Sequence, residues 1–205
     1  MKLLYQTHSP FARKVLVFAH ELGLASQLDV IHHETSPTQR NEEIFALNPL
    51  GKVPVLITDQ GNAIFESSVI CDYLDTLHSE EKMIPETLSD RIEALQIQAI
   101  ADGMSEAGIL VRWESTRRPE ELRYSPFLNG QLEKVISAYD FIENNIDLQG
   151  EMTIGHIALA TSLSWLEFRQ VAPFRQGRPK ISRWYGAFSD RESMVATTLS
   201  GDTQD

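Results

Sequence analysis

Glu66 and Ser67 are a pair of residues suited to hold an α-amino acid. Apolar residues follow them at helical spacing, so Ser67 should lie at the start of a helix. A helix start presents free backbone amides and the positive end of the helix dipole, and both favour a bound carboxylate. The Glu66 carboxylate can pair with an ammonium group. A plain helix cap would also explain both residues, so this signal depends on others.

Val53 and Pro54 form a second signal, because they precede a short apolar run that begins at Val55. Proline cannot donate to a sheet ladder, so Pro54 should lie at a sheet edge or a turn. A cis Val53–Pro54 bond would leave the amide and carbonyl of Val53 free to pair with an extended ligand. The two signals together predict a site for a short peptide.

The order and spacing of Ser9–Lys14, Val53-Pro54 and Glu66-Ser67 resemble the cytosolic glutathione transferase family, over nearly the whole chain. The resemblance implies a bacterial, serine-type glutathione S-transferase with glutathione as its co-substrate. Ser9 would then activate the thiol, Val53 would bind the cysteinyl unit, and the Glu66-Ser67 pair would bind the γ-glutamyl end. The glutathione-binding residues that it implies are Phe11, Arg40, Lys52, Val53, Pro54, Glu66 and Ser67.

Ser9 is the expected catalytic residue. A hydroxyl at a helix start can donate to a thiolate, and each unit by which a thiol pKa is lowered requires about 1.4 kcal/mol. On local sequence alone, Ser9 followed by Pro10 is simply an N-cap and a first helical position. Tyr5 is the weaker alternative, since a short strand also uses tyrosine for packing. Arg13 could add positive potential to the site or lie on an exposed face.

The glycine carboxylate of glutathione would need a cation or amide donors, and three residues offer them. Lys52 lies next to Val53, while Gln39 and Arg40 lie on the preceding loop. Lys52 could equally be a solvated turn residue. His8 could face either the ligand or the solvent.

The pocket for the second substrate, a small hydrophobic electrophile, is only weakly indicated. We expect its wall on the first long helix of the second half, although core packing would explain the apolar residues equally well. The candidates are Met104, Gly108, Val111 and Arg112.

No metal site is expected. His32 and His33 stand beside Glu34 without a suitably spaced third ligand, so we expect them at the surface. Cys71 should be a buried, inert thiol within a helix. The absence of a cysteine near Ser9 sets the chain apart from family branches that form a mixed disulfide with glutathione.

Composition limits the function further. The chain has 205 residues, of which 42% are hydrophobic and 23% charged, as in ordinary globular proteins. Its 18 basic and 29 acidic residues give a formal net charge of −11, which argues against nucleic acid or an anionic membrane as partners. No stretch approaches the roughly 20 apolar residues of a membrane helix. With a single cysteine, which excludes an intramolecular disulfide, we expect a cytoplasmic protein.

The apolar periodicity predicts an α/β thioredoxin-like domain over residues 1–78, a linker over 79–89 and an all-α domain over 90–205. In the first domain a strand at 2–5 and a strand at 28–31 should pair in parallel across a helix, because a helical crossover joins parallel strands. The remaining expected elements are a helical turn at 42–47, a hairpin at 53–57 and 63–65, a helix from Ser67, helices over 90–110, 127–146, 153–168 and a last one over 181–188, and a frayed tail over 197–205.

Thr153 should cap the helix over 153–168, with His156 at the position where the family usually has an aspartate. A histidine should close this capping box less well. The resemblance also implies a homodimer, formed by the helix that holds Cys71 and the first helix beyond the linker. Two alternatives to a transferase remain open: a non-catalytic glutathione-binding or protein-interaction module, and a glutathione-dependent peroxidase or reductive dehalogenase.

Overall fold

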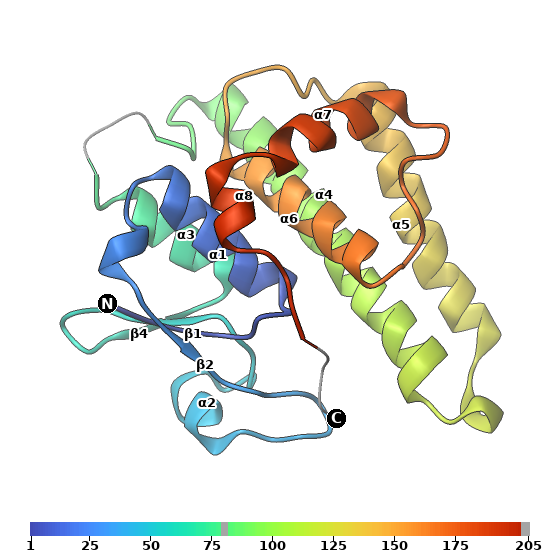
Figure 1. Cartoon of the computed structure of the whole chain (residues 1–205), viewed down its shortest axis with the longest axis horizontal. Helices are drawn as coiled ribbons and strands as arrows, with labels where there is room; N and C mark the ends of the chain where they lie inside the picture. The colour runs from blue at the N-terminus through green and yellow to red at the C-terminus, as the bar shows by residue number, and fades with distance from the viewer. Residues whose placement is uncertain (79–81, 202–205) are drawn as a thin grey trace. The chain divides into compact units, whose positions relative to one another are not determined.

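The computed structural model describes residues 1–78 and 82–201 (Figure 1). Part of the expected linker, 79–81, and the end of the expected tail, 202–205, lie outside the described residues. The chain forms two compact units. The first comprises Met1–Ile84 together with Glu192–Asp205, and the second comprises Pro85–Arg191. This division differs from the expected one, because the end of the chain joins the first unit.

The first unit is built on a four-stranded mixed sheet. Its strands are β1 (Lys2–Tyr5), β2 (Asp29–His32), β3 (Val55–Ile57) and β4 (Ala63–Phe65), in the order β2-β1-β3-β4. β1 and β2 pair in parallel, as predicted, and the other two pairings are antiparallel. The expected thioredoxin-like fold is thereby confirmed.

Helices cover the sheet because the strands are apolar on both faces. The helices of this unit are α1 (Pro10–Glu21), α2 (Glu42–Leu47), α3 (Ser67–Asp75) and α8 (Glu192–Ala196). Ile44 of α2 packs in a cluster with Leu4 and Val55, while α1 and α3 lie together on the opposite side of the sheet (Figure 1). Gly23, at φ 68°, follows the end of α1.

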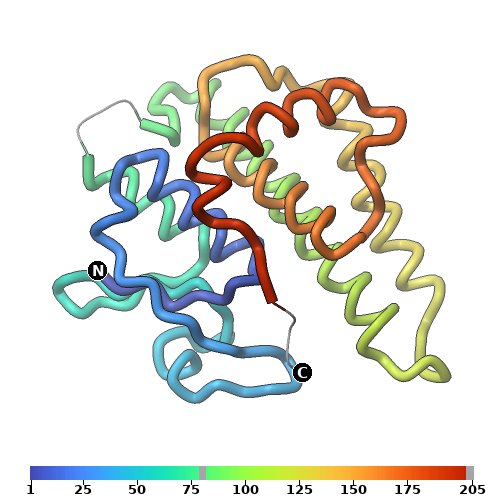
Figure 2. The backbone as a smooth tube through the Cα atoms, viewed as in Figure 1, coloured from blue at the N-terminus to red at the C-terminus, as the bar shows by residue number. Residues whose placement is uncertain are grey.

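The structure of residues 192–201 differs from what the sequence predicted. The helix over 181–188 is not the last one, and residues 197–201 are not a frayed end. α8 returns to the side of α1, as Figure 2 shows in red and blue. Leu199 is buried, and the Ser200 amide donates to the Thr7 carbonyl at 3.2 Å. A five-residue helix is too short to leave a periodic signal in the sequence, which is why it was missed.

The second unit is helical. α4 (Leu88–Arg112) continues into a π-helical turn (Trp113–Arg117) and is followed by α5 (Ser125–Asn145), α6 (Ile154–Phe168) and α7 (Pro179–Ser189). α6 is buried along most of its length and packs closely on α4. A Cβ atom on Gly155 would lie 2.7 Å from the Ala94 carbonyl oxygen, which shows how close the two backbones come. Among the described helices, none combines the length and the apolar character needed to cross a membrane.

The start of α6 also differs from expectation. His156 closes the capping box that we expected to be poorly formed: its Nδ1 lies 3.1 Å from the Thr153 amide, which donates to it, and 3.0 Å from the Thr153 hydroxyl. To accept the amide proton the ring must be neutral, and burial lowers the pKa of His156. A neutral imidazole can thus take the acceptor role of a carboxylate.

Candidate functional site

Ser9 stands at the start of α1 with its side chain held for hydrogen bonding. It adopts extended backbone angles (φ −87°, ψ 123°), and its Oγ accepts from the Ala12 amide at 3.2 Å. Its own amide donates to the Gln6 carbonyl at 3.1 Å. A hydroxyl has one donor and two acceptor sites, so Ser9 can cap the helix and still donate its proton to an anion.

Tyr5, the alternative to Ser9, lies on β1. Its ring packs edge-on against His32 of the neighbouring strand, with 6.2 Å between the ring centroids. Burial raises the pKa of Tyr5, which keeps the phenol protonated at neutral pH. His8 does not face open solvent: it is buried, with its Nε2 3.9 Å from Oε2 of Glu34.

Arg13 does not lie on an exposed face, which removes one of the two alternatives given for it, while its effect on the potential of the site stays a prediction. It is only 4% exposed and is bonded to the returning end of the chain. Its guanidinium donates to the Met194 carbonyl at 2.9 Å and to the Thr197 hydroxyl at 3.3 Å. Sequence reasoning could not place it, because its acceptors lie more than 180 positions away.

Val53 and Pro54 lie just before β3, joined by a cis peptide bond as expected. In the described part of the chain, the Val53 amide and carbonyl make none of the hydrogen bonds that form turns and caps. The preceding loop is held firmly, because the Asn48 side-chain amide donates to the Lys52 carbonyl at 2.8 Å. Gly51, at φ 63°, leaves no room for a Cβ against the Phe45 ring.

Glu66 and Ser67 meet at the start of α3. Glu66 is exposed and has φ 72° and ψ 122°, a conformation that residues other than glycine rarely adopt. Ser67 is 1% exposed, and its hydroxyl donates to Oε1 of Glu66 at 3.1 Å. No side chain caps the first turn of α3. Strained backbone conformations of this kind are found mainly at binding sites, because elsewhere they lower stability without a functional gain.

The three candidates for the glycine carboxylate differ in their surroundings. Arg40 is paired with Glu42 through two bonds of 2.6 and 3.1 Å and lies 3.6 Å above the Phe45 ring. The backbone amide of Gln39 donates to the Ser36 hydroxyl at 2.9 Å. Lys52 is exposed, and its ammonium makes no hydrogen bond or ion pair with any described residue. Lys52 is therefore the available cation.

Phe11 lies in the first unit, and the candidates for the electrophile pocket lie in the second. Phe11 is half-buried in the first turn of α1, with the Lys14 ammonium 5.9 Å from its ring centroid. In the second unit, Met104, Gly108 and Val111 are buried on α4, and Arg112 is half-buried at its end. A Cβ on Gly108 would lie 2.6 Å from Leu166, so this glycine serves the packing of α4 on α6.

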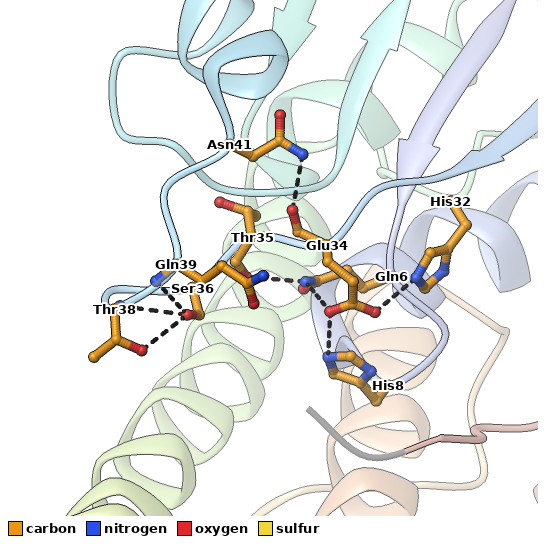
Figure 3. A network of polar contacts seen from close by, with 9 residues as sticks. All are labelled: Gln6, His8, His32, Glu34, Thr35, Ser36, Thr38, Gln39 and Asn41. Atoms are coloured by element: carbon orange, nitrogen blue, oxygen red, sulfur yellow. Dashed lines mark hydrogen bonds and ion pairs between the residues drawn. The ribbon is translucent and has the colours of Figure 1, made fainter. Parts of the chain in front are cut away.

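The loop between β2 and α2 contains residues whose role the sequence did not reveal. Figure 3 shows the Glu34 carboxylate among three side chains that lie on or after β1 and β2: Gln6, His8 and His32. His32 and His33 were expected at the surface beside Glu34; His32 is exposed, whereas His33 is half-buried. The one available signal was Asn41 before an acidic first turn, which is typical of a helix cap, and Asn41 does cap α2. No three or more metal-ligating side chains of the described residues are grouped so that they could hold an ion.

Comparison with known proteins adds to this geometry. Residues 8–77 match the family model for the glutathione S-transferase N-terminal domain. The chain is 30% identical over 203 residues to an uncharacterised GST-like protein, YibF of Escherichia coli, covering 96% of this chain and 98% of the relative.

Two crystal structures of a glutathione transferase family member from Pseudomonas fluorescens Pf-5 are also similar, each at 34% identity. The one with bound glutathione has a TM-score of 0.95 and covers 98% of this chain and 99% of its own. The one with bound S-(propanoic acid)-glutathione has a TM-score of 0.89 and covers 98% and 100%.

Proposed function

Because this chain belongs to the glutathione S-transferase family, we propose that it is a transferase that joins the glutathione thiolate to small hydrophobic electrophiles. Similarity to a family member that binds glutathione and a glutathione S-conjugate supports this proposal. In the reaction, the glutathione sulfur forms a bond to an electrophilic carbon. The thiol proton passes to solvent, and the leaving group departs with its electron pair. With an activated alkene as acceptor, a proton adds at the neighbouring carbon instead.

The first unit holds the tripeptide at three points. Glu66 binds the γ-glutamyl ammonium, and the Ser67 amide binds the γ-glutamyl carboxylate at the start of α3, joined by the Ser67 hydroxyl when its proton turns from Glu66 to the ligand. The main chain of Val53 pairs with the cysteinyl unit ahead of Pro54. Lys52 rather than Arg40 binds the glycine carboxylate, because Glu42 already neutralises Arg40.

The observation that carries this proposal is the position of Ser9. Ser9 is 8% exposed, and its hydroxyl accepts from the Ala12 amide, which leaves the hydroxyl proton to donate to a thiolate. The positive end of the α1 dipole adds a potential that favours the thiolate at the same place. Catalysis then consists mainly of lowering the thiol pKa and positioning the sulfur.

The thiolate absorbance of bound glutathione in the ultraviolet tests the proposal. We expect wild-type protein at pH 7 to show this signal on titration with glutathione, Ser9→Ala to lose it, and Tyr5→Phe to keep it. The Ser9→Ala variant should also be less stable by about 1 kcal/mol, because it loses a helix cap. Absence of glutathione binding by the wild type would instead favour a protein-interaction module.

A panel of acceptors separates a transferase from the other glutathione-dependent enzymes. Conjugation of aryl halides or activated alkenes supports the transferase. Turnover only with hydroperoxides would favour a peroxidase, and release of halide with consumption of a second thiol would favour a reductive dehalogenase. All three reactions use the same thiolate, so Ser9→Ala should impair whichever one occurs.

We also place the protein in the cytoplasm as a homodimer. The reduced, buried thiol of Cys71 and a glutathione co-substrate suit a reducing compartment. Val69 and Leu77 present apolar surface at and just beyond α3, and Leu88 and Ile92 do so at the start of α4, as dimer-forming helices require. Sedimentation at micromolar concentration tests the dimer, and a monomer would contradict it.

A further inference from the structure

Glu34 is the shared acceptor of a polar network beside the start of α1 (Figure 3). Its Oε2 accepts from the Gln6 side-chain amide at 3.1 Å and lies 3.9 Å from Nε2 of His8. Its Oε1 lies 2.6 Å from Nε2 of His32. An ionised carboxylate has about four acceptor positions and no donor, so it can accept from Gln6 and His32 at once, while His8 lies beyond hydrogen-bond distance.

Gln6 links this carboxylate to Ser9. Its buried side-chain amide donates both to Glu34 and to the Thr35 carbonyl, the latter at 2.9 Å. Its backbone carbonyl accepts from the Ser9 amide at 3.1 Å. The turn that carries the Ser9 hydroxyl is thus fastened, through a single residue, to the loop that follows β2.

The same loop is fastened to the segment before Val53. The Thr35 hydroxyl donates to the Gly51 carbonyl at 2.8 Å, and the Asn41 side-chain amide donates to the Glu34 carbonyl at 2.8 Å. The loop therefore connects the part of the chain that holds the sulfur with the part that holds the cysteinyl main chain. Glu34 contributes to this connection through both its carboxylate and its backbone carbonyl.

On the basis of the proposed glutathione function, we propose that Glu34 is a positioning residue for the thiolate. It acts through Gln6 on the turn that orients the Ser9 hydroxyl. Hydrogen bonds to an ionised acceptor are about twice as strong as neutral ones, so the carboxylate restrains Gln6 more firmly than an amide would. A neutral amide at position 34 would also turn a donor toward the Gln6 amide or toward a histidine. Ser9 would then spend less time aligned with the sulfur.

The Glu34→Gln variant tests this role, with Glu43→Gln as its matched control. Glu43 is likewise a carboxylate beside a histidine, with Oε2 3.6 Å from Nδ1 of His33, but it is exposed on α2 and has no bond to Gln6. At saturating glutathione we expect a pH titration of the thiolate absorbance to give about a threefold smaller ratio of thiolate to thiol at pH 7 in Glu34→Gln, which corresponds to half a unit in the pKa of the bound thiol. Glu43→Gln should match the wild type.

Binding of S-methylglutathione separates positioning of the sulfur from general damage to the site. This ligand has the full tripeptide but no thiol to ionise, so its Kd should change less than twofold in Glu34→Gln. Gln6→Leu cuts the same link from the other side and should reduce the thiolate signal to the same extent. The double variant should lose no more than either single one, because both act on one connection.

Three results would overturn the proposal. The first is a wild-type thiolate signal in Glu34→Gln. The second is an equal loss of affinity for glutathione and S-methylglutathione in Glu34→Gln and Gln6→Leu, since Glu34 would then only maintain the fold. The third is a wild type that does not bind glutathione, which would remove the proposed function as well. The wild-type titration thus distinguishes failure of the function from failure of this inference.

Discussion

Replacing Glu66 by glycine and, separately, by alanine should change stability and glutathione binding in different ways. Glu66 has φ 72° and ψ 122°, and such a conformation costs a residue with a Cβ atom about 1–3 kcal/mol. Glycine avoids this cost but loses about 0.5–1 kcal/mol more conformational entropy on folding than alanine. The glycine variant should therefore be more stable than the alanine variant by roughly 0.5–2 kcal/mol.

Alanine is the proper reference because both substitutions remove the same side-chain contact. The bond from the Ser67 hydroxyl to Oε1 of Glu66, at 3.1 Å, is lost in each. The bond from the Ile70 amide to the carbonyl of residue 66, at 2.9 Å, involves only the backbone and remains in each. The difference between the variants thus isolates the backbone conformation.

Thermal unfolding and titration calorimetry measure the two effects. For a chain of this length, 1 kcal/mol corresponds to about 2–4 °C in Tm, so the glycine variant should melt roughly 1–8 °C above the alanine variant. Both variants should bind glutathione about ten- to a hundredfold more weakly, because a hydrogen bond to a charged group is worth about 1.5–3 kcal/mol.

Each part of the reasoning can be refuted separately. An alanine variant as stable as the glycine variant would show that residue 66 is not strained in this conformation. Wild-type affinity for glutathione in both variants would show that the carboxylate of Glu66 does not hold the ligand ammonium. The strain would then need another explanation than binding.

Two further predictions concern α6 and its packing. Burial lowers the folded-state pKa of His156 below its unfolded value near 6.5, so the stabilisation from its neutral ring is fully present above that pH and is lost as the pH falls below it. His156→Gln keeps an acceptor for the Thr153 amide without titrating, so urea unfolding at pH 5.5 and 8 should show a smaller loss on acidification than in the wild type; an equal loss would contradict this. Gly108→Ala should lower the free energy of unfolding by about 1–3 kcal/mol, because the new Cβ would lie 2.6 Å from Leu166. Gly103→Ala on the same helix has no atom within 4 Å of the new Cβ and should raise stability by up to about 1 kcal/mol; the reverse order would contradict the packing.

The sequence predicted the order of the elements up to α7 because each of these elements leaves a local signal. Short apolar runs indicated β1 and the hairpin, and apolar residues at helical spacing indicated α1, α3 and the long helices. The same locality explains why Ser9, Val53 and Ser67 could be placed: helix starts and a proline before a strand are properties of neighbouring residues.

What the sequence did not predict depends on contacts between distant residues. The position of Arg13 is set by acceptors on and after α8, and α8 has no periodic signal of its own. Glu34 accepts from the side chain of Gln6, which lies 28 positions earlier in the chain, and nothing in the sequence around Glu34 indicates that contact. The ion pair between Arg40 and Glu42 was not predictable either, because an exposed arginine has several possible partners.

The return of α8 to α1 has a consequence for how the protein is made. A ribosome synthesises Arg13 early, but the Met194 and Thr197 acceptors of its guanidinium follow only after the whole helical unit. Until then this cation must stay hydrated, since burying it without partners is costly. Burial of this side chain on α1, the helix that begins after Ser9, is thereby tied to synthesis of the chain as far as Thr197.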